Sequence, residues 1–183
     1  MLADTRHVAH DRGVTEPISI HHHHPSWPLA YERERERLVA ALGARLADIA
    51  HVGSTAVPGL AAKPIIDVLV GVADMGVADA CAPAFVALGY APVPADDPDR
   101  RTFRRGGRHD ALDPGYHVHV VPLGSAYWRD RLRFRDLMRA NPRMALHYQA
   151  LKQVLAERCG GDRRAYAAGK AAYIDSVVGT TRP

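Results

Sequence analysis

The sequence predicts an α+β fold in which a mixed β-sheet is flanked by helices and the C-terminal portion is helical. Short apolar or alternating segments, which are typical of strands, lie in the first part of the chain, and helical patterns run from Ser125 onward. Strands that come early and helices that come late are expected of a sheet packed against separate helices. The composition is that of a globular protein, with 47% hydrophobic and 24% charged residues.

The 183 residues are enough for one domain with a substantial core. We expect the domain to span residues 16–178, between tails at residues 1–15 and 179–183. The chain has no apolar run of the roughly 18 to 20 residues that a membrane helix requires, and its N-terminus lacks the apolar core of a secretory signal. These features predict a cytoplasmic protein without a membrane partner. Cys81 and Cys159 lie in no paired motif and are expected to be reduced thiols.

Arginine supplies most of the positive charge, and the formal net charge is +4. Two clusters stand out, five arginines within residues 100–108 and six within residues 129–143. Solvation of the surface explains most of this charge. Either an acidic small ligand or a nucleic acid would explain the clusters. Nucleic acid is not the expected partner, because no nucleic-acid-binding motif accompanies the clusters.

The N-terminal region contains the first expected elements. Residues 16–20 alternate in polarity and predict a short edge strand. The four histidines at 21–24 are interpreted as a solvated loop, with adventitious metal binding as the alternative. Ser26 is expected to cap a helix whose apolar stripe reaches Leu46. The alternating charges of residues 32–37 predict a solvated face of that helix.

Two strands and a helix are expected next. Residues 49–52 predict a short strand, and residues 64–70 form a continuous apolar run of the kind found in central strands. Residues 77–88 predict a helix that ends at Gly89. Residues 91–98, which contain three prolines, are interpreted as a loop.

The C-terminal half begins with two strands, at residues 101–105 and 116–121, and the glycines at 106 and 107 mark a turn or hairpin after the first of them. About three helices follow. Pro142 is expected to start one of them, and the glycine pair at 160–161 to interrupt the pattern before the last.

The turn after the first predicted strand is a candidate phosphate site. Gly53, Ser54 and Thr55 would expose successive backbone N–H groups and two hydroxyls at a chain reversal. If a helix follows, the positive end of its dipole would favour an anion there. Ser54 and Thr55 would equally serve as ordinary helix caps without a ligand.

Asp67 is the candidate metal-binding and catalytic carboxylate. It lies in a strand that is otherwise apolar, where an ionised carboxylate is costly unless a cation, a metal or several donors meet it. An ion pair with an arginine is the structural explanation. The functional explanation is a divalent metal, Mg²⁺, Mn²⁺ or Zn²⁺, facing the Gly-Ser turn.

Residues 51–67, which read HVGSTAVPGLAAKPIID, resemble the signature of the GrpB-like family. The resemblance extends over residues 16–178 and implies a nucleotidyltransferase-like mixed sheet flanked by helices. It also implies that the Gly-Ser turn and Asp67 place a metal-bound triphosphate. Further similar segments are Pro25-Ser26-Trp27-Pro28, residues 116–121, Phe134-Arg135-Asp136, Tyr148 with Lys152, and Tyr166 with Lys170.

The chain departs from that pattern at two positions. Active nucleotidyltransferases carry a second carboxylate two residues after the first, and this chain has Leu69 there, which cannot bind a metal. Because side chains alternate along a strand, Leu69 is expected to border the same cleft as Asp67. His24 also stands where the family has an acidic residue or asparagine.

Histidines on a later strand offer a partial replacement. His117 and His119 alternate with valines, so both imidazoles would share one face. If that strand lies beside Asp67, the three side chains form a candidate metal or acid–base cluster, with His119 as ligand or proton carrier. The alternative is a pair of histidines on a solvated face.

Candidate phosphate ligands complete the predicted site. Tyr148 and Lys152, like Tyr166 and Lys170, are four residues apart and therefore share a helix face. Each basic side chain would hold phosphate if it pointed into a cleft. For any single one of them, we expect the side chain to point outward into solvent. The predicted substrate-binding residues are Gly53, Ser54, Thr55, Lys63, Arg104, Arg135, Lys152 and Lys170.

These observations lead to three functional hypotheses. The first is a protein that binds a nucleotide or another phosphorylated small molecule, with possible metal-assisted nucleotidyl or phosphoryl transfer. The second, favoured by Leu69, is a non-catalytic or regulatory module that binds a nucleotide or anion. The third is a metal-dependent hydrolase built on His117 and His119.

Overall fold

The computed structural model describes residues 17–94, 97–108 and 110–179. Five strands form one mixed sheet in the spatial order β1-β2-β5-β4-β3. The central pair, β2 and β5, is parallel, and every other neighbouring pair is antiparallel. The strands are β1 (Asp48–Val52), β2 (Ile65–Val72), β3 (Ala91–Val93), β4 (Arg101–Arg105) and β5 (Gly115–Pro122).

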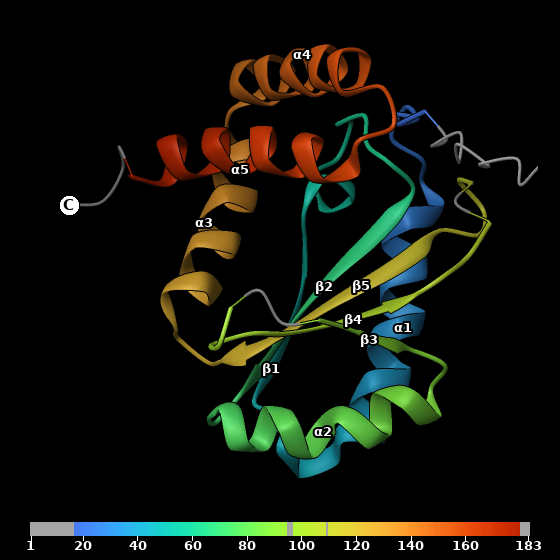
Figure 1. Ribbon diagram of the computed structural model, residues 1–183, viewed down its shortest axis with the longest axis vertical. Helices are drawn as coiled ribbons and strands as arrows, with labels where there is room; N and C mark the ends of the chain where they lie inside the picture. Colours follow the sequence, from blue (N-terminus) through green and yellow to red (C-terminus); the bar gives the residue numbers. More distant parts are fainter. Residues whose placement is uncertain (1–16, 95–96, 109, 180–183) are drawn as a thin grey trace, which may run out of the picture.

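The helices lie on both sides of the sheet. Residues of α1 (Ser26–Leu42) and α2 (Met75–Ala87) share the main core with one face of the sheet. On the other face, Trp128 of α3 (Ala126–Ala140) packs in a cluster with residues of the strands. The helices α4 (Pro142–Cys159) and α5 (Arg163–Gly179) run side by side at the top of Figure 1, and α3 descends from them. The predicted α+β architecture with a helical C-terminal portion is therefore confirmed.

Strand alternation in β2 explains why the two faces differ. Ile66, Val68 and Val70 are completely buried in the core against α1 and α2. The intervening side chains, Asp67 and Leu69 among them, point to the face that α3 covers. A charged residue in an apolar strand thus lies on the side of the sheet where the C-terminal helices leave a cavity.

Several predicted boundaries need correction. Residues 17–20 are not a strand, and only His21 pairs, with Ala62, in an isolated bridge, while residue 16 lies outside the described residues. The helix α1 ends at Leu42 and a 3-10 turn follows, so Leu46 is not part of it. The expected loop after α2 contains the strand β3, which pairs with β4 at the edge of the sheet, where its proline is tolerated.

The N-terminal end of α1 also differs from the expectation. The Ser26 hydroxyl does not cap the helix but donates a hydrogen bond to the carbonyl of Ala111. The histidine segment before it is only partly solvated, because His23 packs edge-on against Trp27 with ring centroids 5.3 Å apart. The predicted tails lie outside the described residues, apart from Gly179, which ends α5.

The charged run on α1 is not a purely solvated face. Glu34 is 2% exposed and accepts hydrogen bonds from Arg37, Tyr90 and Arg105. The physical reason is its helical position, because Glu34 lies seven residues after the buried Trp27 and therefore on the same face. The burial of Glu34 anchors Arg105, which lines the candidate site.

The predicted thiols agree with the structure, in which Cys81 is buried, Cys159 is partly buried and neither forms a disulfide. None of the helices within the described residues is long and apolar enough to cross a membrane.

Candidate functional site

A cavity of about 440 Å³ opens between the sheet and the C-terminal helices. The turn after β1, the first half of β2, β4 and β5 form one wall, and residues of α3, α4 and α5 form the other. Seven lysines and arginines line the cavity, and Asp67 is the one carboxylate among the described lining residues. The cavity is therefore strongly cationic. The basic lining residues are Lys63, Arg104, Arg105, Arg131, Lys152, Arg163 and Lys170.

The turn after β1 reaches the cavity because of Gly53. Its φ of 73° lies in the left-handed region, and a Cβ at this position would overlap the Oδ2 atom of Asp67. Glycine is thus needed at this position for two reasons, the backbone conformation and the close approach to Asp67. As a result, the backbone of the turn lies directly against the Asp67 carboxylate.

The turn continues as a short 3-10 segment, Ser54–Ala56, and not as the helix that the anion site was predicted to use. A three-residue turn has too few aligned peptide groups for a substantial dipole, so that part of the prediction is wrong. Ser54 is half-buried and lines the cavity. The turn therefore offers the cavity the Ser54 side chain and not the N-terminus of a helix.

Thr55 has a structural role. It is 1% exposed, and its hydroxyl donates to the carbonyl of Ile65 over 3.0 Å. Since that bond uses its hydrogen, Thr55 accepts from the Nε2 atom of His51, 3.1 Å away. His51 stacks on Tyr31, and burial lowers the pKa of the imidazole to about 4, which keeps it neutral. These contacts fix the turn to β1 and β2.

Asp67 lies at the centre of the cavity wall, opposite His117 in the register of β2 with β5. Its Oδ1 atom is 3.6 Å from Nδ1 of His117 and 3.9 Å from Nε2 of His119. Burial raises the pKa of Asp67, but the proximity of His117 and His119 outweighs this effect and lowers it overall. Burial also lowers the pKa of His119. The three side chains lie together at the cavity, which agrees with the cluster hypothesis and not with the solvated alternative, and the carboxylate is ionised.

The donor set does not fit a preformed metal centre. No group of three or more histidine, cysteine, aspartate or glutamate side chains within the described parts of the chain has the geometry to hold a metal ion. Leu69, which was expected to border the cleft, is completely buried and packs in a cluster with Val52 and Trp128. It shares a face with Asp67, but α3 covers it, so the position of the missing second carboxylate is not part of the cavity lining.

The lysines of the C-terminal helices point into the cavity, and the expected outward direction is wrong for both. Lys152 of α4 is 1% exposed, and its Nζ atom donates to Ala61 O and, over 3.1 Å, to Ser54 Oγ. Burial and the charge of Lys170 lower the pKa of Lys152 to about 7. Burial also lowers the pKa of Lys170, whose Nζ lies 4.7 Å from the ring centroid of Tyr166.

Lys63 reaches the same aromatic ring from the sheet side of the cavity. Its Nζ atom lies 5.1 Å from the centroid of Tyr166, and burial together with the charge of Lys170 lowers its pKa to about 8. All three lysines of the chain therefore converge on one cavity. Buried ammonium groups with lowered pKa values are cations that lack sufficient negative charge around them.

Two arginines of α3 differ from the prediction. Arg135, predicted to bind substrate, does not line the cavity, because its guanidinium donates to the carbonyl of His51 in β1 and to Asp136, its neighbour on α3. Arg131 does line it and lies 4.6 Å from the ring centroid of Tyr127. The pair Tyr127 and Arg131 has the same four-residue spacing as the tyrosine–lysine pairs, and this signal would have identified it.

Comparisons with known proteins agree with this architecture. The sequence profile of the GrpB family, described as GrpB protein, matches residues 17–179. A UPF0157 protein of Streptomyces coelicolor is 38% identical over 151 residues, which are 82% of this chain and 77% of that relative. The crystal structure of the conserved protein GrpB from Enterococcus faecalis has a TM-score of 0.75 at 30% identity, over 88% of this chain and 96% of that one.

A more distant likeness concerns the fold alone. The crystal structure of the Cid1 poly(U) polymerase with MgGTP bound has a TM-score of 0.51 at 14% identity, over 78% of this chain and 44% of that one. At this identity the likeness shows the fold and nothing of the site. The chain therefore belongs to the GrpB family and has a nucleotidyltransferase-like fold.

Proposed function

We propose that this chain binds a nucleotide or another phosphorylated small molecule in the cationic cavity. The observation that carries the proposal is the convergence of Lys63, Lys152 and Lys170, one buried and two partly buried lysines, on a cavity with one carboxylate among its described lining residues. Burying a charge without a partner is unfavourable, so these amines destabilise the ligand-free protein. A bound phosphate would supply the missing negative charge and accept their hydrogen bonds.

The roles of individual residues follow from their positions. Lys63 and Lys170 lie over the same Tyr166 ring and would hold the charge of the phosphate. Ser54 would donate or accept a hydrogen bond at the turn, and Arg104 would contribute from β4. The close approach of Gly53 to Asp67 would keep the carboxylate fixed beside the ligand.

Nucleotidyl or phosphoryl transfer is the second candidate function. The nucleotidyltransferase-like fold and the ionised Asp67 between two histidines favour it. Leu69 favours binding without transfer, since active superfamily members are expected to have a carboxylate at that position. Assistance by Mg²⁺, Mn²⁺ or Zn²⁺ at Asp67, His117 and His119 stays a prediction, and the binding experiment includes these ions.

The binding proposal is tested by thermal denaturation of the full chain with inorganic phosphate, ADP, ATP, UTP, phosphosugars and coenzyme A precursors, each with and without the three metals. A ligand that binds only the native state raises the melting temperature. We expect stabilisation by phosphorylated compounds and none by adenosine, which lacks phosphate.

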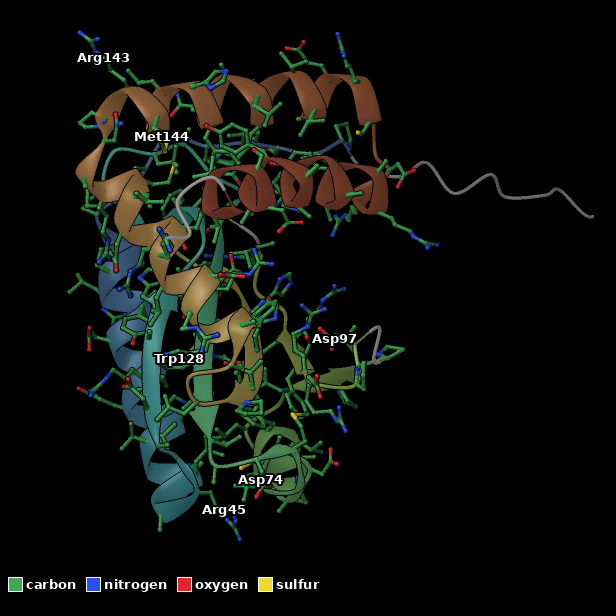
Figure 2. The ribbon with its side chains drawn as sticks, turned by 90° about the vertical axis from the view of Figure 1, so that its left-hand side faces the viewer. Arg45, Asp74, Asp97, Trp128, Arg143 and Met144 are labelled. Atoms are coloured by element: carbon green, nitrogen blue, oxygen red, sulfur yellow. The ribbon has the colours of Figure 1, made fainter. Side chains whose placement is uncertain are left out.

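A matched pair of variants assigns the effect to the cavity. Lys170→Met should weaken the apparent affinity for the phosphorylated ligand at least tenfold, because one cation of the cavity is lost. Arg143→Met removes an exposed cation of α4 that points away from the protein in Figure 2 and should leave the ligand affinity unchanged. If no phosphorylated compound stabilises the protein, or if both variants behave alike, the proposal is wrong.

A further inference from the structure

Ser54 and Lys152 form a contact whose geometry goes beyond anion binding. The Nζ atom of Lys152 lies 3.1 Å from the Oγ atom of Ser54, although 98 residues separate them. Lys152 is 1% exposed, and within the described residues no carboxylate forms an ion pair with it. Its other hydrogen-bond partner is the carbonyl oxygen of Ala61. Both hydrogen-bond partners are uncharged, and the amine also lies 5.0 Å from the ring centroid of Tyr148. The ammonium form therefore meets the face of an aromatic ring but no opposite charge within the described residues.

An uncharged amine can accept a proton from the hydroxyl beside it. Burial and the charge of Lys170 lower the pKa of Lys152 to about 7, so a large fraction of the amine is neutral at slightly alkaline pH. A neutral amine has two hydrogens and one lone pair. When one hydrogen goes to Ala61 O, the lone pair can accept the hydrogen of Ser54. A serine paired in this way with a neutral lysine is an activated nucleophile.

The neighbouring hydroxyls show why Ser54 is the residue concerned. Thr55 donates its hydrogen to Ile65 O and accepts from His51, so its hydroxyl is fully used within the turn. The Ser54 hydroxyl is hydrogen-bonded to Lys152 Nζ, which can accept its hydrogen when the amine is neutral. Of the two adjacent hydroxyls, Ser54 alone is both open to the cavity and next to a basic nitrogen.

We infer that Ser54 is a nucleophile and Lys152 its general base, and that Ser54 attacks a phosphorus atom of the bound phosphorylated ligand. The inference deepens the proposed function, on which it rests, by adding a covalent step. A bond forms between Ser54 Oγ and phosphorus, and the bond from phosphorus to the leaving oxygen breaks, with its electron pair staying on that oxygen. The proton of Ser54 moves to Lys152 Nζ, which can return it to the leaving group.

The step produces a phosphorylated or nucleotidylated Ser54. Water or an acceptor hydroxyl would later attack the phosphorus, take up the transferred group and restore the free serine. Lys63 and Lys170 lie in the same cavity and would stabilise the negative charge during transfer. The charge of a phosphate ligand raises the pKa of Lys152, so reaction with an anionic substrate should require a higher pH than reaction with an uncharged reagent.

An uncharged phosphorus reagent tests the pair without requiring the natural substrate. The full-length protein is treated with diisopropyl fluorophosphate, and intact mass and peptide mapping identify the modified residue. We expect one adduct, at Ser54, and none there in Ser54→Ala. Between pH 6 and pH 8 the labelling rate should rise about tenfold, because the neutral fraction of an amine with a pKa of about 7 changes by that factor.

Two lysine variants distinguish a base from a structural residue. Lys152→Met preserves the apolar length of the side chain and should lower the labelling rate at pH 8 at least tenfold, and its melting curve shows whether it is folded. Lys170→Met keeps the base but removes the like charge beside it, so the midpoint of the pH profile should move upward. This shift is a readout that a merely structural lysine would not give.

The inference is overturned if the folded wild-type protein is not labelled at Ser54, or if folded Lys152→Met reacts as fast as the wild type. It is also overturned if the pH profile is the same in Lys170→Met. Binding of a phosphorylated compound without any labelling would leave the proposed function intact and remove the covalent step. The absence of phosphate binding would remove the proposed function whatever the reagent does.

Discussion

Gly53 and Asp67 approach each other so closely that a methyl group on Gly53 would occupy the position of a carboxylate oxygen of Asp67. The contact joins the turn after β1 to the middle of the cavity wall. It also explains the Gly-Ser sequence of the turn from local geometry, because Gly53 has a φ of 73° that other residues rarely adopt.

Gly53→Ala should lower the free energy of unfolding by about 3 kcal/mol, through backbone strain and the clash with Asp67. Gly59→Ala is the matched control, because its φ is 78° and a Cβ there would have no neighbour within 4 Å. The control should cost about 1 kcal/mol from the backbone alone. Urea denaturation measures both values. Equal losses in the two variants would show that the approach to Asp67 is not tight.

Glu34→Gln tests the buried anchor of Arg105. Removing the negative charge leaves Arg105 without its ion-pair partner and should lower the free energy of unfolding by about 3 kcal/mol. Glu36→Gln changes an exposed glutamate two residues away on the same helix and should change it by less than about 0.5 kcal/mol. A Glu34 variant as stable as the Glu36 variant would contradict the structural role of this pair.

Stability should fall in mild acid because His51 is held neutral. Its pKa is about 4 in the folded protein against 6.5 in the unfolded chain, so between these values the unfolded chain binds more protons. Acidification through this window therefore favours unfolding. From pH 7 to pH 4.5 the wild type should lose about 2–3 kcal/mol more than His51→Gln, which cannot titrate. Denaturant unfolding at both pH values measures the difference, and equal losses would show that His51 does not control the acid sensitivity.

The sequence predicted most of the regular structure because hydrophobic periodicity directly reflects burial. The strand around Asp67, the start of α4 at Pro142 and the break at Gly160 followed from local patterns, whereas the expected cap at Ser26 did not form. The edge strand β3 did not, because its proline and exposed position resemble a loop. Glu34 was missed for a different reason, since charge alternation hid its place on the buried face of α1.

The candidate site was predicted in part. Pairing of β2 with β5 brought Asp67 to His117 and His119, which the alternation of polar and apolar residues had suggested. The direction of the lysines depends on how α4 and α5 pack over the sheet, and Leu69 is covered by a helix distant in sequence. Such long-range packing has no local sequence signal, which is why the inward lysines and the contact of Arg135 with the His51 carbonyl could not be predicted.

The most direct test of the account is the number of protons taken up when a phosphorylated ligand binds. Isothermal titration calorimetry at pH 8, in buffers with different ionisation enthalpies, gives this number for any compound that stabilises the protein. Lys63, with a pKa of about 8, is half protonated at that pH, so a phosphate that contacts it should cause uptake of about half a proton from this residue alone. Lys63→Met should lose this part of the uptake. Binding without proton uptake, or uptake that is unchanged in Lys63→Met, would contradict the claim that the lysines of the cavity receive the phosphate.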